Sequence, residues 1–124
     1  MSKRILLIED NEQNRYLVTY LLQAHGWEVV HAADGPAGLA LAAAATPALI
    51  LLDIQLPGMD GYAVARALRE NPALDAIPVV AVTSYAMAGD RERCLEAGCN
   101  GYIEKPIDPQ TFAAQVLQFV QAQA

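Results

Sequence analysis

The sequence has few basic residues, few cysteines and no long hydrophobic run, and each shortage argues against a class of function. Eight lysines and arginines stand against fourteen acidic residues, which gives a net charge of −6. Direct binding to nucleic acid requires a basic surface, so this balance disfavours that function. No stretch of about 18 apolar residues, the length needed to span a bilayer, is present. We therefore expect neither nucleic acid nor membrane as a partner.

The cysteines and the amino-terminal stretch give no sign of secretion. Cys94 and Cys99 are too few and wrongly spaced for a CxxC pair or a zinc site. The opening MSKRILLIED has a basic pair, but acids follow at once and there is no cleavage site, so it does not resemble a signal peptide. We expect a cytoplasmic protein with two reduced cysteines.

Short apolar runs alternate with helical patterns along the chain. More than half of the 124 residues are apolar, which is sufficient for one domain with its own core. The third and fourth runs are apolar throughout, as is typical of central strands in a parallel sheet covered on both faces. The predicted strands are Arg4–Ile8, Trp27–His31, Ala48–Asp53, Pro78–Thr83 and Gly101–Ile103.

Helices with recognisable ends are predicted between these strands. The first has an apolar stripe over Leu17–Leu22 and ends at Gly26, and the second runs from Asp34-Gly35-Pro36 to before Pro47. The third covers Gly61–Glu70, and the fourth carries Leu95 and ends at Gly98. The fifth has Asp108 as N-cap and Pro109 at its first position. Crossovers between parallel strands are right-handed, so the helices must cover both sheet faces. The sequence therefore predicts an α/β fold, a doubly wound, flavodoxin-like (βα)5 domain with strand order 2-1-3-4-5 and a crevice at the carboxyl ends of strands one and three.

Polar residues lie at or directly after the carboxyl ends of four of the predicted strands, and the fold would bring them to one edge. Clustered carboxylates repel one another unless a cation joins them, and Mg²⁺ prefers such hard oxygen ligands. A carboxylate beside Mg²⁺ can attack a phosphoryl group, whose oxygens then need hydroxyl and ammonium donors. The residues are Glu9-Asp10, Asp53, Thr83-Ser84 and Lys105-Pro106. Asp53 is thus a candidate nucleophile.

Taken together, these residues resemble the response-regulator receiver domain, the CheY-like phosphoacceptor of two-component signalling. The resemblance covers essentially the whole chain. It is carried by IEDNEQN at 8–14, LLDIQLPGMDG at 51–61, VVAVTSYA at 79–86 and GYIEKPID at 101–108. The first of these stretches and residues 86–107 are most similar to DivK-type single-domain regulators. They also resemble receivers carried by hybrid histidine kinases.

The resemblance implies how the site would work. Asp53 would accept a phosphoryl group from a phosphohistidine on a sensor histidine kinase or a histidine phosphotransfer protein. Mg²⁺ or Mn²⁺ would be held by Asp10, the Asp53 carboxylate and the backbone carbonyl of Gln55, with Glu9 acting through a metal-bound water. Thr83 would hydrogen-bond the phosphoryl group, and Lys105 would pair with it.

The resemblance also implies a switch. Tyr102 would turn inward as Thr83 moves, and this would remodel the face formed by the fourth helix, the fifth strand and the fifth helix, where a downstream protein docks. Gln55 and Tyr85 would tune access of the attacking water, and the small Ser84 would leave the site open to the donor histidine. The peptide bond before Pro106 would be cis.

We therefore expect one receiver domain over residues 1–124 with no output domain, acting as a monomer or a weak phosphorylation-dependent dimer. It would catalyse its own phosphorylation and dephosphorylation without being a turnover enzyme. Two alternatives stay open, namely a receiver module of a hybrid kinase and a pseudo-receiver that works without phosphorylation. A haloacid-dehalogenase-like phosphatase would need an aspartate in place of Gln55, and a flavodoxin would not present the acids of EDNEQN to a phosphate.

Overall fold

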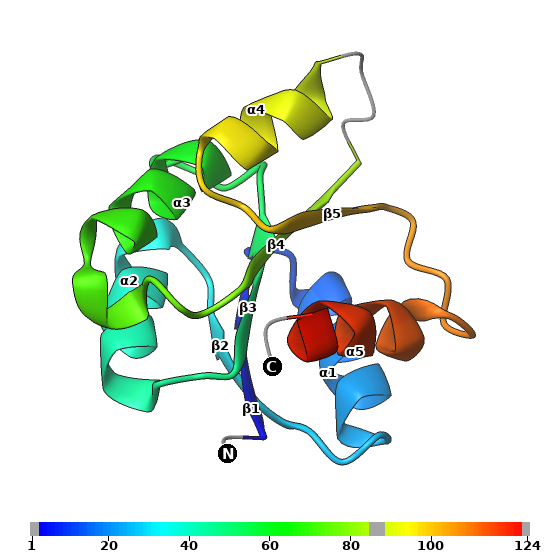
Figure 1. Ribbon diagram of the computed structural model, residues 1–124. Helices are drawn as coiled ribbons and strands as arrows, with labels where there is room; N and C mark the ends of the chain where they lie inside the picture. Colours follow the sequence, from blue (N-terminus) through cyan, green and yellow to red (C-terminus); the bar gives the residue numbers. More distant parts are fainter. Residues whose placement is uncertain (1–2, 85–88, 123–124) are drawn as a thin grey trace.

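The computed structural model describes residues 3–84 and 89–122, in which five strands alternate with five helices (Figure 1). The strands are β1 (Arg4–Ile8), β2 (Glu28–Ala32), β3 (Leu49–Asp53), β4 (Val79–Thr83) and β5 (Gly101–Glu104). The helices are α1 (Glu12–Gln23), α2 (Gly35–Ala45), α3 (Gly61–Glu70), α4 (Asp90–Glu96) and α5 (Phe112–Ala122), with a short 3-10 turn, η1 (Pro72–Leu74), before β4. No helix in these two ranges is long and apolar enough to cross a membrane.

The strands form one parallel sheet in the order β2-β1-β3-β4-β5, which confirms the predicted topology. Each predicted strand agrees with the observed one to within one residue at both ends. The register pairs Ile8 with Leu52, Asp53 with Val82 and Thr83 with Glu104. The carboxyl ends of β1, β3, β4 and β5 therefore finish at the same edge of the sheet.

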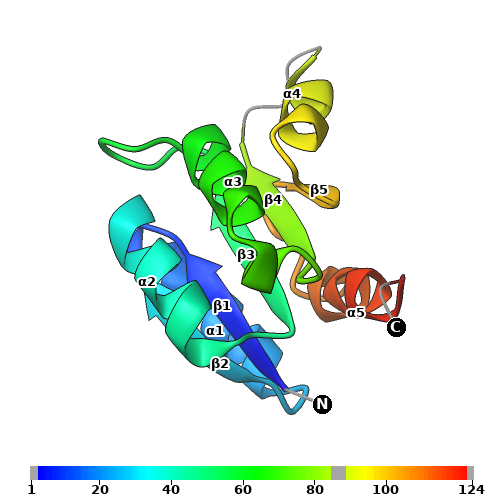
Figure 2. The same ribbon diagram turned by 60° about the vertical axis from the view of Figure 1, so that its left-hand side comes forward.

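The central strands send alternate side chains into two separate hydrophobic clusters. Leu6 and Ile8 of β1 belong to a cluster beneath α2, α3 and α4, whereas Ile5 and Leu7 belong to a cluster beneath α1 and α5. Figure 2 shows α2 and α3 on one side of the sheet and α5 on the other. Both sheet faces are buried, and this explains why β3 and β4 are apolar throughout.

The amino-terminal ends of three helices are fixed by side-chain caps. Asn11, Asp34 and Asp60 each accept a hydrogen bond from the backbone amide three residues later, at 2.9 Å in every case. Such a cap satisfies an amide that would otherwise have no partner in the first turn. The predicted starts of α2 and α3 are thereby confirmed.

The predicted start of α5 was wrong, although Asp108 does make a capping contact. Its carboxylate accepts from the amide of Gln110 at 2.9 Å. Its backbone carbonyl accepts from both Thr111 at 3.1 Å and Phe112 at 3.0 Å. The shared carbonyl shapes residues 109–111 into a tighter turn, so regular α-helix begins at Phe112 rather than at Pro109.

The structure also differs from the sequence analysis at α4. This helix ends at Glu96, and Gly98 follows with a φ of +111°, a left-handed conformation that glycine adopts readily. The sequence analysis singled out Leu95, but that side chain is 46% exposed and Cys94 is the residue that α4 buries. Because Cys94 lies among charged residues, the sequence pattern did not indicate that it is the residue of α4 that faces the core.

Arg69, near the carboxyl end of α3, joins three chain segments at the opposite edge of the sheet. Its Nε donates to the carbonyl of Gly98 at 2.8 Å, and its Nη2 donates to the Oδ1 of Asn100 at 2.6 Å. Its Nη1 lies within hydrogen-bond distance of three carbonyls that precede β4, those of Leu74, Asp75 and Ile77. One guanidinium therefore holds the starts of β4 and β5 against α3.

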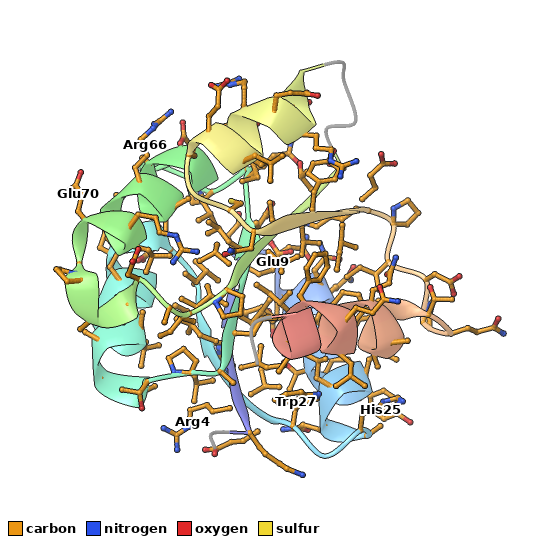
Figure 3. All side chains as sticks on the ribbon, viewed as in Figure 1. Arg4, Glu9, His25, Trp27, Arg66 and Glu70 are labelled. Carbon is orange, nitrogen blue, oxygen red and sulfur yellow. The ribbon has the colours of Figure 1, made fainter. Side chains whose placement is uncertain are left out.

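Replacing Arg69 with alanine should lower the free energy of unfolding by roughly 2 to 3 kcal/mol, because several carbonyls lose a charged donor at once. Urea denaturation measures this loss. Arg66→Ala is the matched control, since Arg66 points away from the protein on the same helix (Figure 3). The control should change stability by less than about 0.5 kcal/mol. Equal losses of unfolding free energy in Arg69→Ala and Arg66→Ala would contradict the stabilising role given to Arg69.

Candidate functional site

The carboxyl ends of β1, β3, β4 and β5 surround an acidic cleft of about 550 Å³. One carboxylate oxygen from each of Glu9, Asp10 and Asp53 lies within 4.8 Å of the other two. In Figure 3, Glu9 lies inside the molecule at the end of β1, and Arg4 marks the opposite end of that strand. The cleft is lined by Glu9, Asp10, Asn11, Asn14, Asp53, Gln55, Ser84, Lys105 and Pro106. The crevice predicted from the sequence is therefore present.

One ammonium group pairs with both buried carboxylates in this cleft and offsets part of their charge. Glu9 is 3% exposed and Asp53 is 4% exposed, whereas Asp10 is open to solvent. The Nζ of Lys105 lies 2.8 Å from Glu9 Oε1 and 3.5 Å from Asp53 Oδ2. A buried charge without such a partner is strongly destabilising, so Lys105 stabilises the ionised forms of Glu9 and Asp53.

The surroundings of Glu9 favour its neutral form. Burial raises the pKa of the Glu9 carboxyl to about 7 from an ordinary value of 4.5. The neighbouring Asp53 acts in the same direction, and Lys105 opposes the shift. Near neutral pH this carboxyl therefore lies close to the point at which it gains or loses a proton.

The two carboxylate oxygens of Asp53 have different surroundings. Oδ1 accepts a hydrogen bond from the backbone amide of Gln55 at 3.0 Å, whereas Oδ2 faces Lys105. The first contact fixes the side-chain rotation, and the second turns one oxygen toward the cation. Asp53 is thus held in one orientation before any ligand arrives.

Gly61 allows α3 to approach the loop that carries Asp53. A Cβ at this position would lie 2.5 Å from the Cα of Ile54 and 2.6 Å from the carbonyl oxygen of Asp53. These are backbone atoms, which cannot move aside as a flexible side chain could. The Gly61 amide donates to the Ile54 carbonyl at 3.0 Å, so the close approach also ties α3 to the end of β3.

The other predicted site residues lie at the ends of β4 and β5. Thr83 is 1% exposed, and its carbonyl accepts from the Lys105 amide at 2.8 Å. The Lys105–Pro106 peptide is cis, as predicted. Tyr102 is half-buried and packs against the cluster beneath α2, α3 and α4. Tyr85, the second predicted tuning residue, lies outside the described residues.

A side-chain hydrogen bond joins two loops at the cleft. The Ser84 hydroxyl donates to Gln55 Oε1 at 2.7 Å, which connects the segment after β4 with the segment after β3. Both residues are exposed and line the cleft. Gln55 and Ser84 are therefore joined at the edge of the cleft, whereas separate tuning roles were expected for them from the sequence.

The sequence analysis missed Arg15. Its Nη1 donates to the backbone carbonyls of Glu9 at 2.9 Å and Asp10 at 3.1 Å. Arg15 lies four residues after the N-cap Asn11, and side chains of a helix lean toward its amino-terminal end. That spacing alone could have indicated an arginine directed back over the acidic loop.

The residues brought together in this way can hold a divalent cation and present a carboxylate to an electrophile. Three oxygen donors meet in a cleft with room for water, as hard cations prefer. An ammonium group and a hydroxyl-bearing strand end lie next to the carboxylate. Such an arrangement suits the transfer of a phosphoryl group, whose charge must be screened on every side.

Comparisons with known proteins agree on one family. Residues 5–117 match the response regulator receiver domain. The chain is 41% identical over 120 residues to the polar-differentiation response regulators DivK of Brucella ovis and Brucella melitensis, which covers 97% of this chain and 98% of each relative.

Solved structures of the same fold include two informative neighbours. One is the receiver domain of the sensor histidine kinase PA1611 from Pseudomonas aeruginosa, described with a magnesium ion coordinated in its active-site cleft. It is 33% identical, with a TM-score of 0.88 over 98% of this chain and 99% of that one. The other is the chemotaxis protein CheY4 of Vibrio cholerae, 27% identical, with a TM-score of 0.90 over 96% of this chain and 99% of that one.

The raised pKa of Glu9 makes stability depend on pH when no metal is bound. Between pH 4.5 and about 7 the folded protein binds more protons at Glu9 than the unfolded chain does, so this contribution is full below pH 4.5 and is lost as the pH rises through 7. It amounts to at most about 3 to 4 kcal/mol, at roughly 1.4 kcal/mol per pKa unit.

Glu9→Gln should therefore flatten the fall in stability over this window. Urea denaturation in a chelator between pH 4 and 8 measures the slope. Glu70→Gln is the control, because Glu70 points into solvent from α3 (Figure 3). A wild-type slope in the Glu9→Gln protein would show that another group titrates.

Proposed function

The chain belongs to the response-regulator receiver family, and we propose that its cleft transfers a phosphoryl group from a phosphohistidine to Asp53. A receiver is a phosphoacceptor rather than a turnover enzyme, and membership of the family implies a histidine kinase as partner. The observation that carries the proposal is the meeting of the Glu9, Asp10 and Asp53 carboxylates in one cleft, with the Lys105 ammonium group 3.5 Å from Asp53 Oδ2.

The donor set of the cleft fits Mg²⁺ or Mn²⁺. Asp10, the Asp53 carboxylate and the backbone carbonyl of Gln55 would hold the cation, and Glu9 would reach it through a water. When bound, the metal supplies positive charge that screens the approach of the phosphoryl group to a carboxylate. Lys105 no longer has to balance Glu9 alone, so its ammonium group is available to the incoming phosphoryl oxygens.

The residues of the chain have distinct roles in this transfer. The Asp53 oxygen that faces Lys105 attacks phosphorus, and the bond from phosphorus to the donor histidine nitrogen breaks with its electron pair left on that nitrogen. Lys105 pairs with one phosphoryl oxygen, and the Thr83 hydroxyl donates to another. The hydrogen-bonded pair Gln55–Ser84 lies where water would later approach to hydrolyse the acyl phosphate. We propose that it and Tyr85 tune that step.

The chemistry is tested by intact-mass measurement after incubation with Mg²⁺ and a small acyl-phosphate donor. We expect one phosphoryl adduct that requires Mg²⁺ and is absent from Asp53→Asn. Asp34→Asn is the matched control, because asparagine can also cap α2 and the lost carboxylate lies outside the cleft. An adduct that persists in Asp53→Asn would overturn the assignment. No adduct from the small donor or from a phosphorylated histidine kinase would favour the pseudo-receiver.

The proposed output is a change in the face formed by α4, β5 and α5. Leu95 of α4 and Leu117 of α5 are 46% and 43% exposed, which suits a surface that docks a protein. Thr83 is tied to β5 through its carbonyl, so movement of its side chain toward a phosphoryl group would reach Tyr102 through neighbouring strands. The second candidate function is that of a receiver module of a hybrid histidine kinase. Its target protein would be a phosphotransfer protein.

We further propose that the protein acts in the cytoplasm as a monomer or a weak phosphorylation-dependent dimer. Cys94 and Cys99 are both buried free thiols, as a reducing compartment would keep them. The acidic net charge also argues against nucleic acid as the target. A single domain covering residues 1–124 is consistent with the one continuous sheet.

The switch is tested separately from the chemistry. A shift from mostly off to mostly on requires about 5.5 kcal/mol of bias toward the active state. Amide NMR spectra of the Mg²⁺ form should change in β5 and α4 when a phosphoryl mimic is added. Thr83→Ala should still bind the mimic but lose the changes at Tyr102, while Thr19→Ala on α1 should behave as wild type. Spectra that stay unchanged in the wild-type protein would overturn the switch.

A further inference from the structure

We propose that Arg15 is a positioning residue that sets the affinity of the acidic cleft for a divalent cation, an inference that rests on the proposed function. Arg15 belongs to α1 and does not line the cleft. It acts instead on the backbone of the loop that carries two of the three carboxylates. Its contacts are to main-chain carbonyls, so the cleft's own side chains do not reveal it.

The geometry of these contacts fixes two successive peptide units. Nη1 of Arg15 has two hydrogens and two acceptors, the Glu9 carbonyl at 2.9 Å and the Asp10 carbonyl at 3.1 Å. With both carbonyls directed toward one atom, the rotation of the backbone at Asp10 is restricted. The direction in which the Asp10 side chain leaves the backbone is restricted with it.

The need for this restraint differs between the two acids. Glu9 is already held by burial and by the hydrogen bond that its backbone amide donates to the Ala32 carbonyl at 3.0 Å. Its carboxylate is also held by Lys105. Asp10 is exposed and lies in the middle of the irregular segment between β1 and α1. An exposed carboxylate loses conformational freedom when it binds a cation, and a backbone fixed beforehand reduces that cost.

A role through charge and a role through positioning predict opposite changes in Mg²⁺ affinity when the Arg15 side chain is removed. A guanidinium group on the backbone of the loop that carries Glu9 and Asp10 repels a second cation, so its removal would strengthen metal binding if charge alone mattered. If Arg15 holds the loop in place, its removal weakens metal binding. The sign of the change in Mg²⁺ affinity therefore separates the two roles without reference to catalysis.

The experiment is a calorimetric titration of wild type, Arg15→Met and Arg66→Met with Mg²⁺ alone. Methionine keeps most of the aliphatic stem but has no donor, and Arg66 on α3 loses the same charge far from the cleft. We expect the Mg²⁺ affinity to fall about tenfold in Arg15→Met, as for other residues that orient metal ligands, and to stay within about twofold in Arg66→Met. An affinity in Arg15→Met that equals or exceeds that of Arg66→Met would overturn the proposal.

Arg15→Lys supplies the conservative variant. Its ammonium group keeps the charge but lacks the planar fork, so the affinity should lie between those of wild type and Arg15→Met. Circular dichroism shows whether each variant folds. Should Arg15→Met not fold, Arg15→Lys decides the matter, since a weakened affinity supports the proposal and a wild-type affinity overturns it.

Adduct formation provides a second readout. In Arg15→Met the Mg²⁺ concentration for half-maximal phosphorylation should rise by the same factor as the dissociation constant. The rate at saturating Mg²⁺ should stay near wild type, because Asp53, Thr83 and Lys105 are untouched. A lowered maximal rate with unchanged Mg²⁺ dependence would overturn the positioning role. Wild-type protein that binds no Mg²⁺ would instead overturn the proposed function, and with it this inference.

Discussion

The structure depends on balancing the charge of two carboxylates that are buried side by side at the end of an apolar sheet. Glu9 directly follows β1 and Asp53 is the last residue of β3, and the residues that precede each of them are almost entirely removed from water. Their partner Lys105 lies 96 residues along the chain from Glu9. The ammonium group comes from the last βα unit, so Glu9 and Asp53 gain this partner only when β5 has joined the sheet. Fold completion and site assembly are in this sense the same event.

The same constraint explains how the site can respond to a ligand. The negative charge at Glu9 and Asp53 can be reduced or compensated by an ammonium group, by a proton on Glu9, whose pKa is raised to about 7, or by a divalent cation. These three compensate the same charge and therefore compete. Under the proposed function, a metal that replaced the proton would leave Lys105 available to pair with a phosphoryl group.

The sequence was sufficient for the sheet and for the acidic edge, because both follow from patterns that burial imposes. Continuous apolar runs identified β3 and β4, and acids directly after β1 and β3 had to meet once the strands were parallel. Contacts to backbone carbonyls leave no comparable pattern. For that reason the role of Arg69 and the late start of α5 came only from the structure, and Arg15 left no signal beyond its spacing from Asn11. The buried face of α4 was not predicted either, because its buried residue is a cysteine among charged residues.

Main-chain contacts, more than side-chain identity, hold the reactive groups where the chemistry needs them. The Gln55 amide orients Asp53, the Lys105 amide holds the Thr83 carbonyl, and Gly61 admits α3 against the loop after β3. A chain could keep all of its acids and its lysine and still lose function if these contacts were absent. Their presence here therefore bears on the choice between an active receiver and a pseudo-receiver. A cleft whose backbone is fixed around Asp53 in this way favours the active one.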